Sequence, residues 1–133
     1  MSADDNLKTI QTIYEAFGRG DVGVILDAVD DDVDWGVESA TMTGPWYGPR
    51  HGKDGVLAFF EQFAAAMEVQ EFTPTAFGAN ETDVFTVVRC RATSRQTGRP
   101  MDMNLHHYFR FRDGKISYYR GTEDSAQLAA ALA

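Results

Sequence analysis

The sequence has little cysteine and no long apolar run. Cys90 is the single cysteine among 133 residues, so no disulfide can form within the chain. It lies in the segment TVVRCRAT, which predicts a strand, and we expect a small core residue there rather than a nucleophile. No apolar stretch approaches the roughly 18 residues that a membrane-spanning helix needs. The first residues, MSADDNLKTI, lack the apolar centre of a signal peptide, and a cytoplasmic protein is expected.

Positive charge is also scarce. The chain has 12 Lys and Arg against 20 Asp and Glu, a formal net charge of −8. Proteins that bind nucleic acids or anionic membranes use a basic face to neutralise phosphates, so neither partner is expected. The three histidines and the one cysteine show no spacing typical of a metal site. The composition therefore favours a neutral ligand, or one met by a local positive group.

The apolar residues that are present suffice for one folded domain over residues 1–133, since 44% of the chain is hydrophobic. Periodicity predicts helices over residues 4–18, capped by Asp4 or Asp5, over 53–67 and over 125–132, and a short helix capped by Asp21. It predicts strands around 33–37 and over 69–78, 83–95, 100–112 and 115–123. A Gly- and Pro-rich loop is expected between the strand around 33–37 and the helix over 53–67. The strand with Pro74 is predicted to be poor. Helices on one face of a bent antiparallel sheet make an α+β fold, a cone that can hold a small molecule.

Four segments together resemble a known superfamily. They are IYEAFGRGD, DDDVDW, YGPRHGKDGVLAFF and HYFRFRDGKI, in this order along the chain. The sequence is similar to the nuclear transport factor 2-like proteins, and within them to the SnoaL-like family of polyketide cyclases, ketosteroid isomerases and limonene epoxide hydrolases. The resemblance implies a strongly curved antiparallel sheet packed against three N-terminal helices, a short C-terminal helix, and a homodimer. Because this fold hosts many chemistries and several non-enzymes, function needs its own argument.

Carried over to this chain, the resemblance implies a pocket that contains Tyr14 and His107. Tyr14 falls where relatives place a pocket tyrosine, and His107 falls where cyclase-like members have a pocket histidine. Two positions depart from the pattern. Gly121 stands where the cyclases carry their catalytic aspartate, and Gly36 or Val37 stands where the isomerases carry their base. Neither mechanism can therefore be copied onto this chain.

Alternation along residues 103–111 supports the same pocket. Leu105, His107 and Phe109 share a face that is otherwise apolar, whereas His106 points to the opposite side. The adjacent histidines therefore cannot hold one metal ion together. A desolvated histidine favours the neutral imidazole, which can act as a base or a donor. The alternative is a core histidine tied to a buried hydroxyl or carbonyl.

The last strand adds a carboxyl group to the candidate site. Glu123 lies two residues past Gly121 and is a candidate to replace the missing aspartate in part, although it would lie nearer the mouth of the cone. Asp124 is more simply explained as the cap of the terminal helix. The predicted catalytic residues are His107 and Tyr14. The predicted substrate-binding residues are Trp35, Val37, Trp46, Phe60, Leu105, Phe109, Tyr119 and Glu123.

Two pairs of residues allow more than one interpretation. Trp46 and Tyr47, in the Gly- and Pro-rich loop, can gate the mouth or pack at the surface. Arg89 and Arg91 share a strand face and can bind an acid in the pocket or pair with Glu across a dimer, which we favour.

Three functions are compatible with these residues. The leading hypothesis is a cofactor-independent enzyme of isomerase, cyclase or hydrolase type, acting on a small apolar carbonyl or polyketide-like compound. His107 would be a base or donor, and Tyr14 would donate to an oxyanion. The alternatives are a module that binds an apolar ligand without turnover and a structural dimer with a closed cone. Gly121 favours the alternatives, whereas His107 with Tyr14 favours the enzyme.

Overall fold

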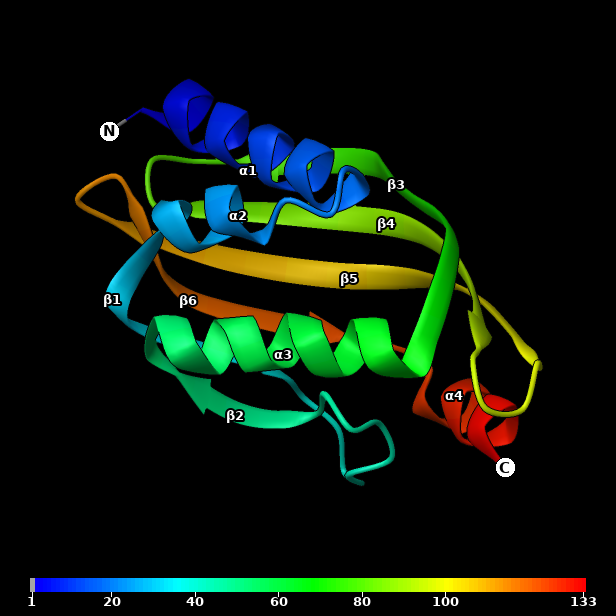
Figure 1. The fold of residues 1–133 in the computed structure, drawn as a ribbon. Coiled ribbons are helices and arrows are strands. Elements are labelled where there is room, and N and C mark those ends of the chain that lie inside the picture. The colour runs from blue at the N-terminus through cyan, green and yellow to red at the C-terminus, as the bar shows by residue number, and fades with distance from the viewer. Residues whose placement is uncertain (1) are drawn as a thin grey trace.

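Three helices lie on one side of a six-stranded sheet in the computed structural model, which describes residues 2–133 (Figure 1). The helices are α1 (Ala3–Gly18), α2 (Val22–Ala28) and α3 (Gly52–Ala66), and a short α4 (Ser125–Leu132) lies beside one end of the sheet. The strands are β1 (Val29–Val37), β2 (Gly48–His51), β3 (Met67–Ala79), β4 (Asp83–Ser94), β5 (Pro100–Arg112) and β6 (Lys115–Thr122). The predicted α+β arrangement is confirmed.

The strands follow the order β2-β1-β6-β5-β4-β3. Neighbours are antiparallel except β1 and β6, which run parallel, with Trp35 opposite Tyr119 and Val37 opposite Gly121. The sheet is therefore mixed, and the prediction of a purely antiparallel sheet is corrected at this one pair. Most of the chain separates β1 from β6, so no short turn fixes their relative direction.

Irregular pairings bend the sheet. The register shifts between Val69 and Glu71 and between Pro74 and Ala76 in β3, and between Arg110 and Phe111 in β5. Such bulges increase the local twist and curve a strand. Strand β3 is longer than predicted because it is an edge strand, where a proline at a bulge disrupts no central ladder.

Sequence patterns missed two local features. Strand β2 lies inside the predicted loop and pairs with β1 from Asp34–His51 to Val37–Gly48. The cap of α1 is Ser2 rather than Asp4 or Asp5. Its hydroxyl accepts from the Asp5 backbone N–H, and the Asp5 carboxylate in turn accepts from Ser2, a capping box. Asp21 caps α2 as predicted.

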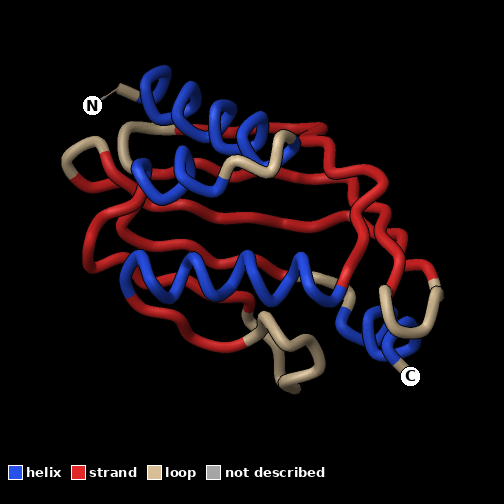
Figure 2. The backbone as a smooth tube through the Cα atoms, viewed as in Figure 1, coloured by secondary structure: helices blue, strands red, loops and turns tan. Residues whose placement is uncertain are grey.

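The core fills the space between the helices and the concave face of the sheet. Figure 2 shows the helices in blue and the strands in red. Its fully buried side chains include Ile10, Ile25, Val33, Val56, Met67 and Ile116. Cys90 is also fully buried, and burial raises the pKa of its thiol to about 12, as suits a core residue rather than a nucleophile. None of the helices within residues 2–133 is both long and apolar enough to cross a membrane.

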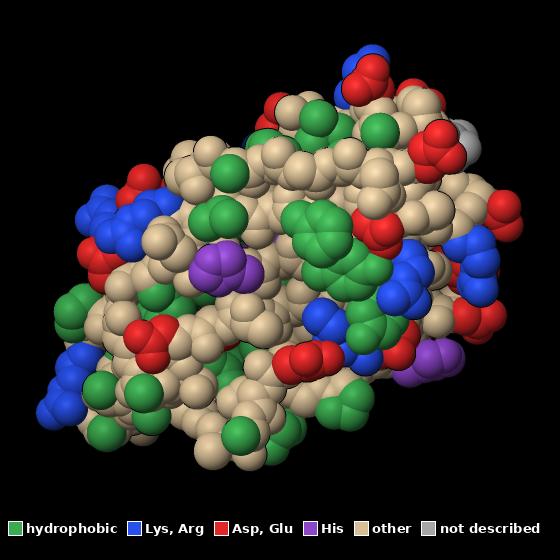
Figure 3. All heavy atoms as spheres, turned by 180° about the vertical axis from the view of Figure 1, so that it is seen from behind, with side chains coloured by type: hydrophobic (Ala, Val, Ile, Leu, Met, Phe, Trp, Pro, Cys, Tyr) green, Lys and Arg blue, Asp and Glu red, His purple; other side chains and the backbone are tan. Residues whose placement is uncertain are grey.

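The face of the sheet turned away from the helices carries an outer aromatic patch, defined as Phe85, Tyr108 and Tyr118. Phe85 is 53% exposed and stacks on Tyr108 with ring centroids 5.0 Å apart. Arg110 and Arg120 lie over the Tyr118 ring, 4.7 and 4.2 Å from its centroid. Figure 3 shows hydrophobic side chains gathered on this face, with charged groups of both signs around them.

Candidate functional site

A cavity lies between the helices and the concave face of the sheet. All ten side chains that the sequence analysis selected line it: Tyr14, Trp35, Val37, Trp46, Phe60, Leu105, His107, Phe109, Tyr119 and Glu123. Six further apolar side chains complete the wall: Ile13, Phe17, Ile25, Phe59, Phe63 and Phe72. The structure thus brings the predicted residues together, while their roles stay predictions.

The free space in the cavity is narrow. The empty volume is about 560 Å³, of which about 50 Å³ is open to the centre of a water-sized sphere. One water needs roughly 10–15 Å³ on that measure, so the cavity as folded has room for a few waters. A larger hollow of about 410 Å³ adjoins it and shares the side chains of Phe17, Phe60, Phe63 and Phe72. These four side chains line both spaces, and a ligand much larger than a few waters needs side chains of the wall to move.

A tyrosine–histidine pair forms one polar end of the cavity. Tyr14 comes from the fourth turn of α1 and His107 from the middle of β5, and the Tyr14 hydroxyl lies 2.6 Å from His107 Nδ1. The two rings are nearly parallel, with an interplanar angle of 6°. Thr86 stands opposite His107 on β4, and its buried hydroxyl has no partner in hydrogen-bond geometry within residues 2–133.

Both members of this pair are neutral near pH 7. Burial lowers the pKa of His107 to about 3, and the neighbouring His106 lowers it further. Burial also raises the pKa of the Tyr14 hydroxyl, an effect that the nearby Thr86 hydroxyl partly offsets. The prediction of a neutral imidazole is borne out. A conjugate acid with so low a pKa makes His107 a weak base, so hydrogen-bond donation suits it better than proton abstraction.

The pair has one hydrogen to offer a ligand in either tautomer. If Tyr14 donates to Nδ1, the His107 Nε2–H is free. If Nδ1–H donates to the Tyr14 oxygen, the Tyr14 O–H is free. In both arrangements one N–H or O–H donor stays available inside an apolar wall. A carbonyl oxygen is the ligand group that such a donor suits.

Tyr119 occupies the space beside Gly121. A Cβ atom on Gly121 would lie 2.4 Å from the Tyr119 hydroxyl and 3.3 Å from His107 Cδ2. The Tyr119 ring is held by stacking on Trp35, with centroids 4.1 Å apart. A carboxylate side chain therefore cannot grow from position 121 while Tyr119 keeps this position.

Glu123 forms a second polar end of the cavity. Its Oε1 atom is buried and has no hydrogen-bond partner within residues 2–133. Burial raises the pKa of the Glu123 carboxyl, and the nearby groups of Tyr47 and Trp46 lower it in part without reaching Oε1 in hydrogen-bond geometry. Glu123 as a whole is half-buried, so its expected position nearer the mouth of the cone stays a prediction. Trp46 is fully buried and packs edge-on against Phe63, so its surface alternative is wrong.

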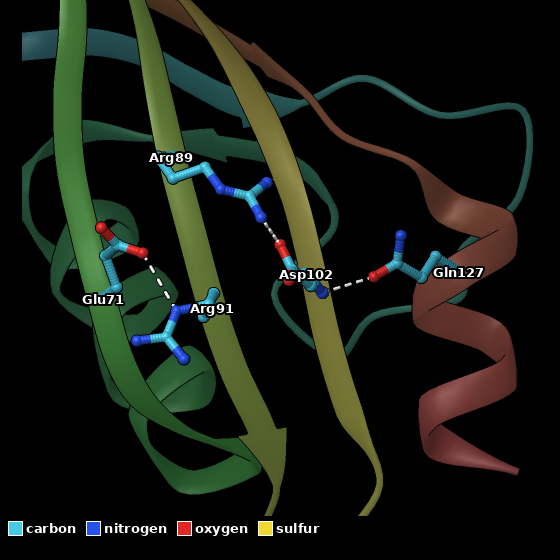
Figure 4. A network of polar contacts seen from close by, with 5 residues as sticks. All are labelled: Glu71, Arg89, Arg91, Asp102 and Gln127. Atoms are coloured by element: carbon cyan, nitrogen blue, oxygen red, sulfur yellow. Dashed lines mark hydrogen bonds and ion pairs between the residues drawn. The ribbon is translucent and has the colours of Figure 1, made fainter.

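The arginines of β4 lie outside the cavity. In Figure 4, Arg91 pairs with Glu71 of β3 at 3.0 Å, while Arg89 pairs with Asp102 of β5, whose backbone N–H donates to Gln127 of α4. Both arginines thus find carboxylates within their own chain, and neither binds an acid in the pocket. Within residues 2–133, no three His, Cys, Asp or Glu side chains come together as a metal site.

Some wall residues escaped the sequence analysis. Phe59 and Phe63 follow each other at helical spacing on α3, and that spacing could have placed them beside Phe60. Two residues beside the wall were also not selected: Thr86 gave no such signal, and Tyr47 was considered only as a gate at the mouth or a surface residue. Tyr47 lies in a loop, and Thr86 is one hydroxyl in a β-branched strand. Only the packed structure brings them to Glu123 and Tyr14.

Comparison with known proteins agrees with this geometry. A family model described as a SnoaL-like domain matches residues 10–119. No curated protein matches the sequence. A nuclear transport factor 2-like protein of unknown function from Burkholderia pseudomallei has 26% identity and a TM-score of 0.88 over 96% of this chain and 97% of its own.

Two further structures share the fold at lower identity. TerC, crystallised with polyporic acid, has 21% identity and a TM-score of 0.83 over 96% of this chain and 98% of its own. A protein of Xanthomonas campestris pv. campestris, provisionally named a polyketide cyclase, has 19% identity and a TM-score of 0.76 over 98% of both chains. The cone-shaped fold that the resemblance implied is confirmed.

Proposed function

Because the chain belongs to the SnoaL-like domain family, we propose that its cavity binds a small, mostly apolar carbonyl compound and performs acid/base chemistry on it without a cofactor. The observation that carries this proposal is the 2.6 Å contact between the Tyr14 hydroxyl and His107 Nδ1 inside an apolar wall. The reaction would be of isomerase, cyclase or hydrolase type. A structural neighbour provisionally named a polyketide cyclase, and another crystallised with polyporic acid, support this class of ligand.

The Tyr14–His107 pair would act as a hydrogen-bond donor to the carbonyl oxygen. A water molecule in the cavity would take the proton from the carbon next to the carbonyl group and pass it to solvent. The free N–H or O–H of the pair would stabilise the negative charge that develops on the carbonyl oxygen in this step. Because the donor lies in a desolvated site, it would be worth more there than in water. Both groups are neutral near pH 7, so the pair needs no counterion in the wall.

A ligand-binding test compares acetophenone with ethylbenzene, which has a similar shape but no carbonyl oxygen. One added hydrogen bond of about 1.4 kcal/mol predicts roughly tenfold tighter binding of the ketone. Tyr14→Phe and His107→Leu should each reduce this preference, whereas His106→Leu should leave it, because His106 is exposed on the opposite face. Isothermal titration calorimetry measures the affinities. Equal affinity for both compounds in wild type would contradict the proposal.

A chemical test follows the exchange of the α-protons of the bound ketone in D₂O by NMR. Wild type should accelerate exchange over buffer, and Tyr14→Phe should abolish most of that acceleration. This readout needs no knowledge of the natural substrate, because loss of an α-proton is the first step of many carbonyl reactions.

The second candidate function is a binding module. The observations that favour it are the low pKa of His107, which makes it a weak base, and the narrow free space of the cavity. Tight binding of the ketone with no α-proton exchange above buffer would select the binding module over the enzyme.

A further inference from the structure

Glu123 stands out among the cavity side chains because its buried Oε1 atom meets no donor in hydrogen-bond geometry within residues 2–133, although Tyr47 and Trp46 are close enough to lower the pKa of its carboxyl in part. Its Oε1 atom is buried without a hydrogen-bond partner, as are the hydroxyl of Tyr47 and the indole Nε1 of Trp35. Native proteins leave few buried polar atoms unpaired, since each costs free energy. All three side chains lie at the cavity or beside it, so a ligand is a natural source of the missing partner.

A structural role does not account for the Glu123 carboxyl. The cap of α4 is its neighbour Asp124, whose side chain accepts from the Gln127 backbone N–H at 3.1 Å. The cavity wall contains no lysine or arginine, so no cation compensates the carboxyl from there. Tyr47 lies beside it, and the pKa of Tyr47 is raised first by burial and then by the charge of Glu123. The carboxyl thus stays available to a hydrogen-bond donor that enters the cavity.

Tyr119 lies between the two polar ends. Its ring centroid is 5.4 Å from that of His107, and it lines the same cavity as Glu123. Burial raises the pKa of the Tyr119 hydroxyl well above its ordinary value, so this group is neutral near pH 7. The space between the ends is apolar, with Trp35 stacked on Tyr119 and Phe109 5.0 Å from it. With a polar group at each end and an apolar wall between, the cavity would suit a flat apolar body with two polar groups, once side chains of the wall move to make room for it.

We propose that Glu123, with Tyr47 beside it, binds the hydroxyl or amino group of a ligand whose carbonyl oxygen meets the Tyr14–His107 pair. This inference rests on the proposed function and narrows its ligand to a hydroxylated or aminated aromatic or cyclic carbonyl compound. A site built to accept a hydrogen bond discriminates strongly against an analogue that lacks the donor, because its own buried group is then left unpaired.

The test uses three compounds of nearly equal shape: 3-hydroxyacetophenone, 4-hydroxyacetophenone and 4-methylacetophenone. In wild type, at least one hydroxy compound should bind roughly tenfold or more tightly than the methyl compound. In Glu123→Leu this preference should fall to about one. Glu61→Leu is the matched control, because Glu61 is an exposed carboxylate on α3 outside the cavity wall, and it should leave the preference unchanged. A preference that persists in Glu123→Leu would overturn the inference.

The two proposals fail in different ways. If wild type binds acetophenone no more tightly than ethylbenzene, the proposed function is overturned. Retention of that preference, with no gain from the hydroxyl group, overturns the Glu123 inference alone. If no compound binds, the melting temperatures of wild type and Glu123→Leu show whether the Glu123 carboxyl is unpaired. Glu123→Leu should then melt higher than wild type, because an unpaired buried carboxyl is removed, and an equal or lower value would show that the carboxyl already has a structural partner.

Discussion

The neutral state of His107 makes the free energy of unfolding depend on pH. In the unfolded chain the imidazole takes a proton near its ordinary pKa of 6.5, whereas in the folded protein the pKa is lowered to about 3. Stability is therefore fully present above pH 6.5 and is lost as the pH falls toward 3. Between pH 7 and pH 5 this group alone should remove about 2 kcal/mol.

Urea unfolding at pH 7 and pH 5 checks this prediction. Wild type should lose more stability than His107→Gln over that interval, and the difference isolates His107. Comparison between variants is needed because the raised pKa of Glu123 acts in the opposite direction, favouring the folded state as the pH falls. His51→Gln, which removes an exposed histidine, is the control and should follow wild type. Parallel pH profiles of wild type and His107→Gln would contradict the assignment.

Substitutions at Tyr119 and Gly121 should have non-additive effects on stability, because the Tyr119 hydroxyl occupies the space beside Gly121. Gly121→Ala places a Cβ 2.4 Å from the Tyr119 hydroxyl, and stacking on Trp35 prevents the ring from moving away. Overpacking of this kind should destabilise the protein by roughly 1–3 kcal/mol. The loss should be smaller in a Tyr119→Phe background, where the oxygen is absent and the next contacts lie at 3.2 and 3.3 Å.

A double-mutant cycle by chemical denaturation measures this coupling. Gly78→Ala is the control, since a Cβ on this strand glycine meets nothing within 4 Å. An equal loss for Gly121→Ala in both backgrounds would show that the hydroxyl does not fill the space. Sequence alone identified Gly121 as a departure from the family pattern, but only packing shows what stands there instead.

At the scale of elements, local patterns located the long helices and strands but not the pairings between distant ones. The alternation of Leu105, His107 and Phe109 placed His107 inside because strand side chains alternate whatever the partner strand. Strand β2 has only four residues, and nothing but its pairing with β1 marks GPRH as a strand. On β6, Ile116 and Tyr119 are both buried although strict alternation would place them on opposite faces, because the register shifts at this point of the β5–β6 pairing.

In the candidate site, too, local patterns placed single residues but not the contacts between distant ones. Tyr14 and His107 could be predicted because each lies on the apolar side of a regular element. The 2.6 Å contact between them joins positions 93 residues apart, so no local pattern contains it. Tyr47 beside Glu123 also depends on how α4 packs, since Leu128 of that helix lies against the same turn as the Tyr47 ring.

The cap of α4 should matter for stability. Asp124 accepts from the Gln127 backbone N–H, one of the donors that the first turn of a helix leaves free. Asp124→Ala should destabilise the protein by about 1 kcal/mol, whereas Asp124→Ser, which keeps a capping oxygen, should lose much less. Thermal unfolding of both variants checks this prediction. Equal losses would show that the side chain acts through its charge rather than as a cap.

At the scale of the whole molecule, the outer aromatic patch offers a surface for a second copy of the chain. Phe85 of β4 is 53% exposed, and the half-buried Tyr108 and Tyr118 extend the patch across β5 and β6. Large exposed aromatic side chains grouped on one face are typical of interaction sites. A two-fold dimer would bury Phe85 of each copy on the same surface of the other.

Phe85→Asp should therefore weaken self-association without unfolding the protein. An aromatic side chain near the centre of an interface contributes about 2 kcal/mol or more, so the dissociation constant should rise roughly 30-fold. Analytical ultracentrifugation across micromolar concentrations measures it, and circular dichroism confirms the fold. Leu57→Asp, on the exposed side of α3, is the control and should leave association unchanged. If wild type sediments as a monomer at all micromolar concentrations tested, the predicted dimer is excluded, and the outer aromatic patch is exposed to solvent in the native protein.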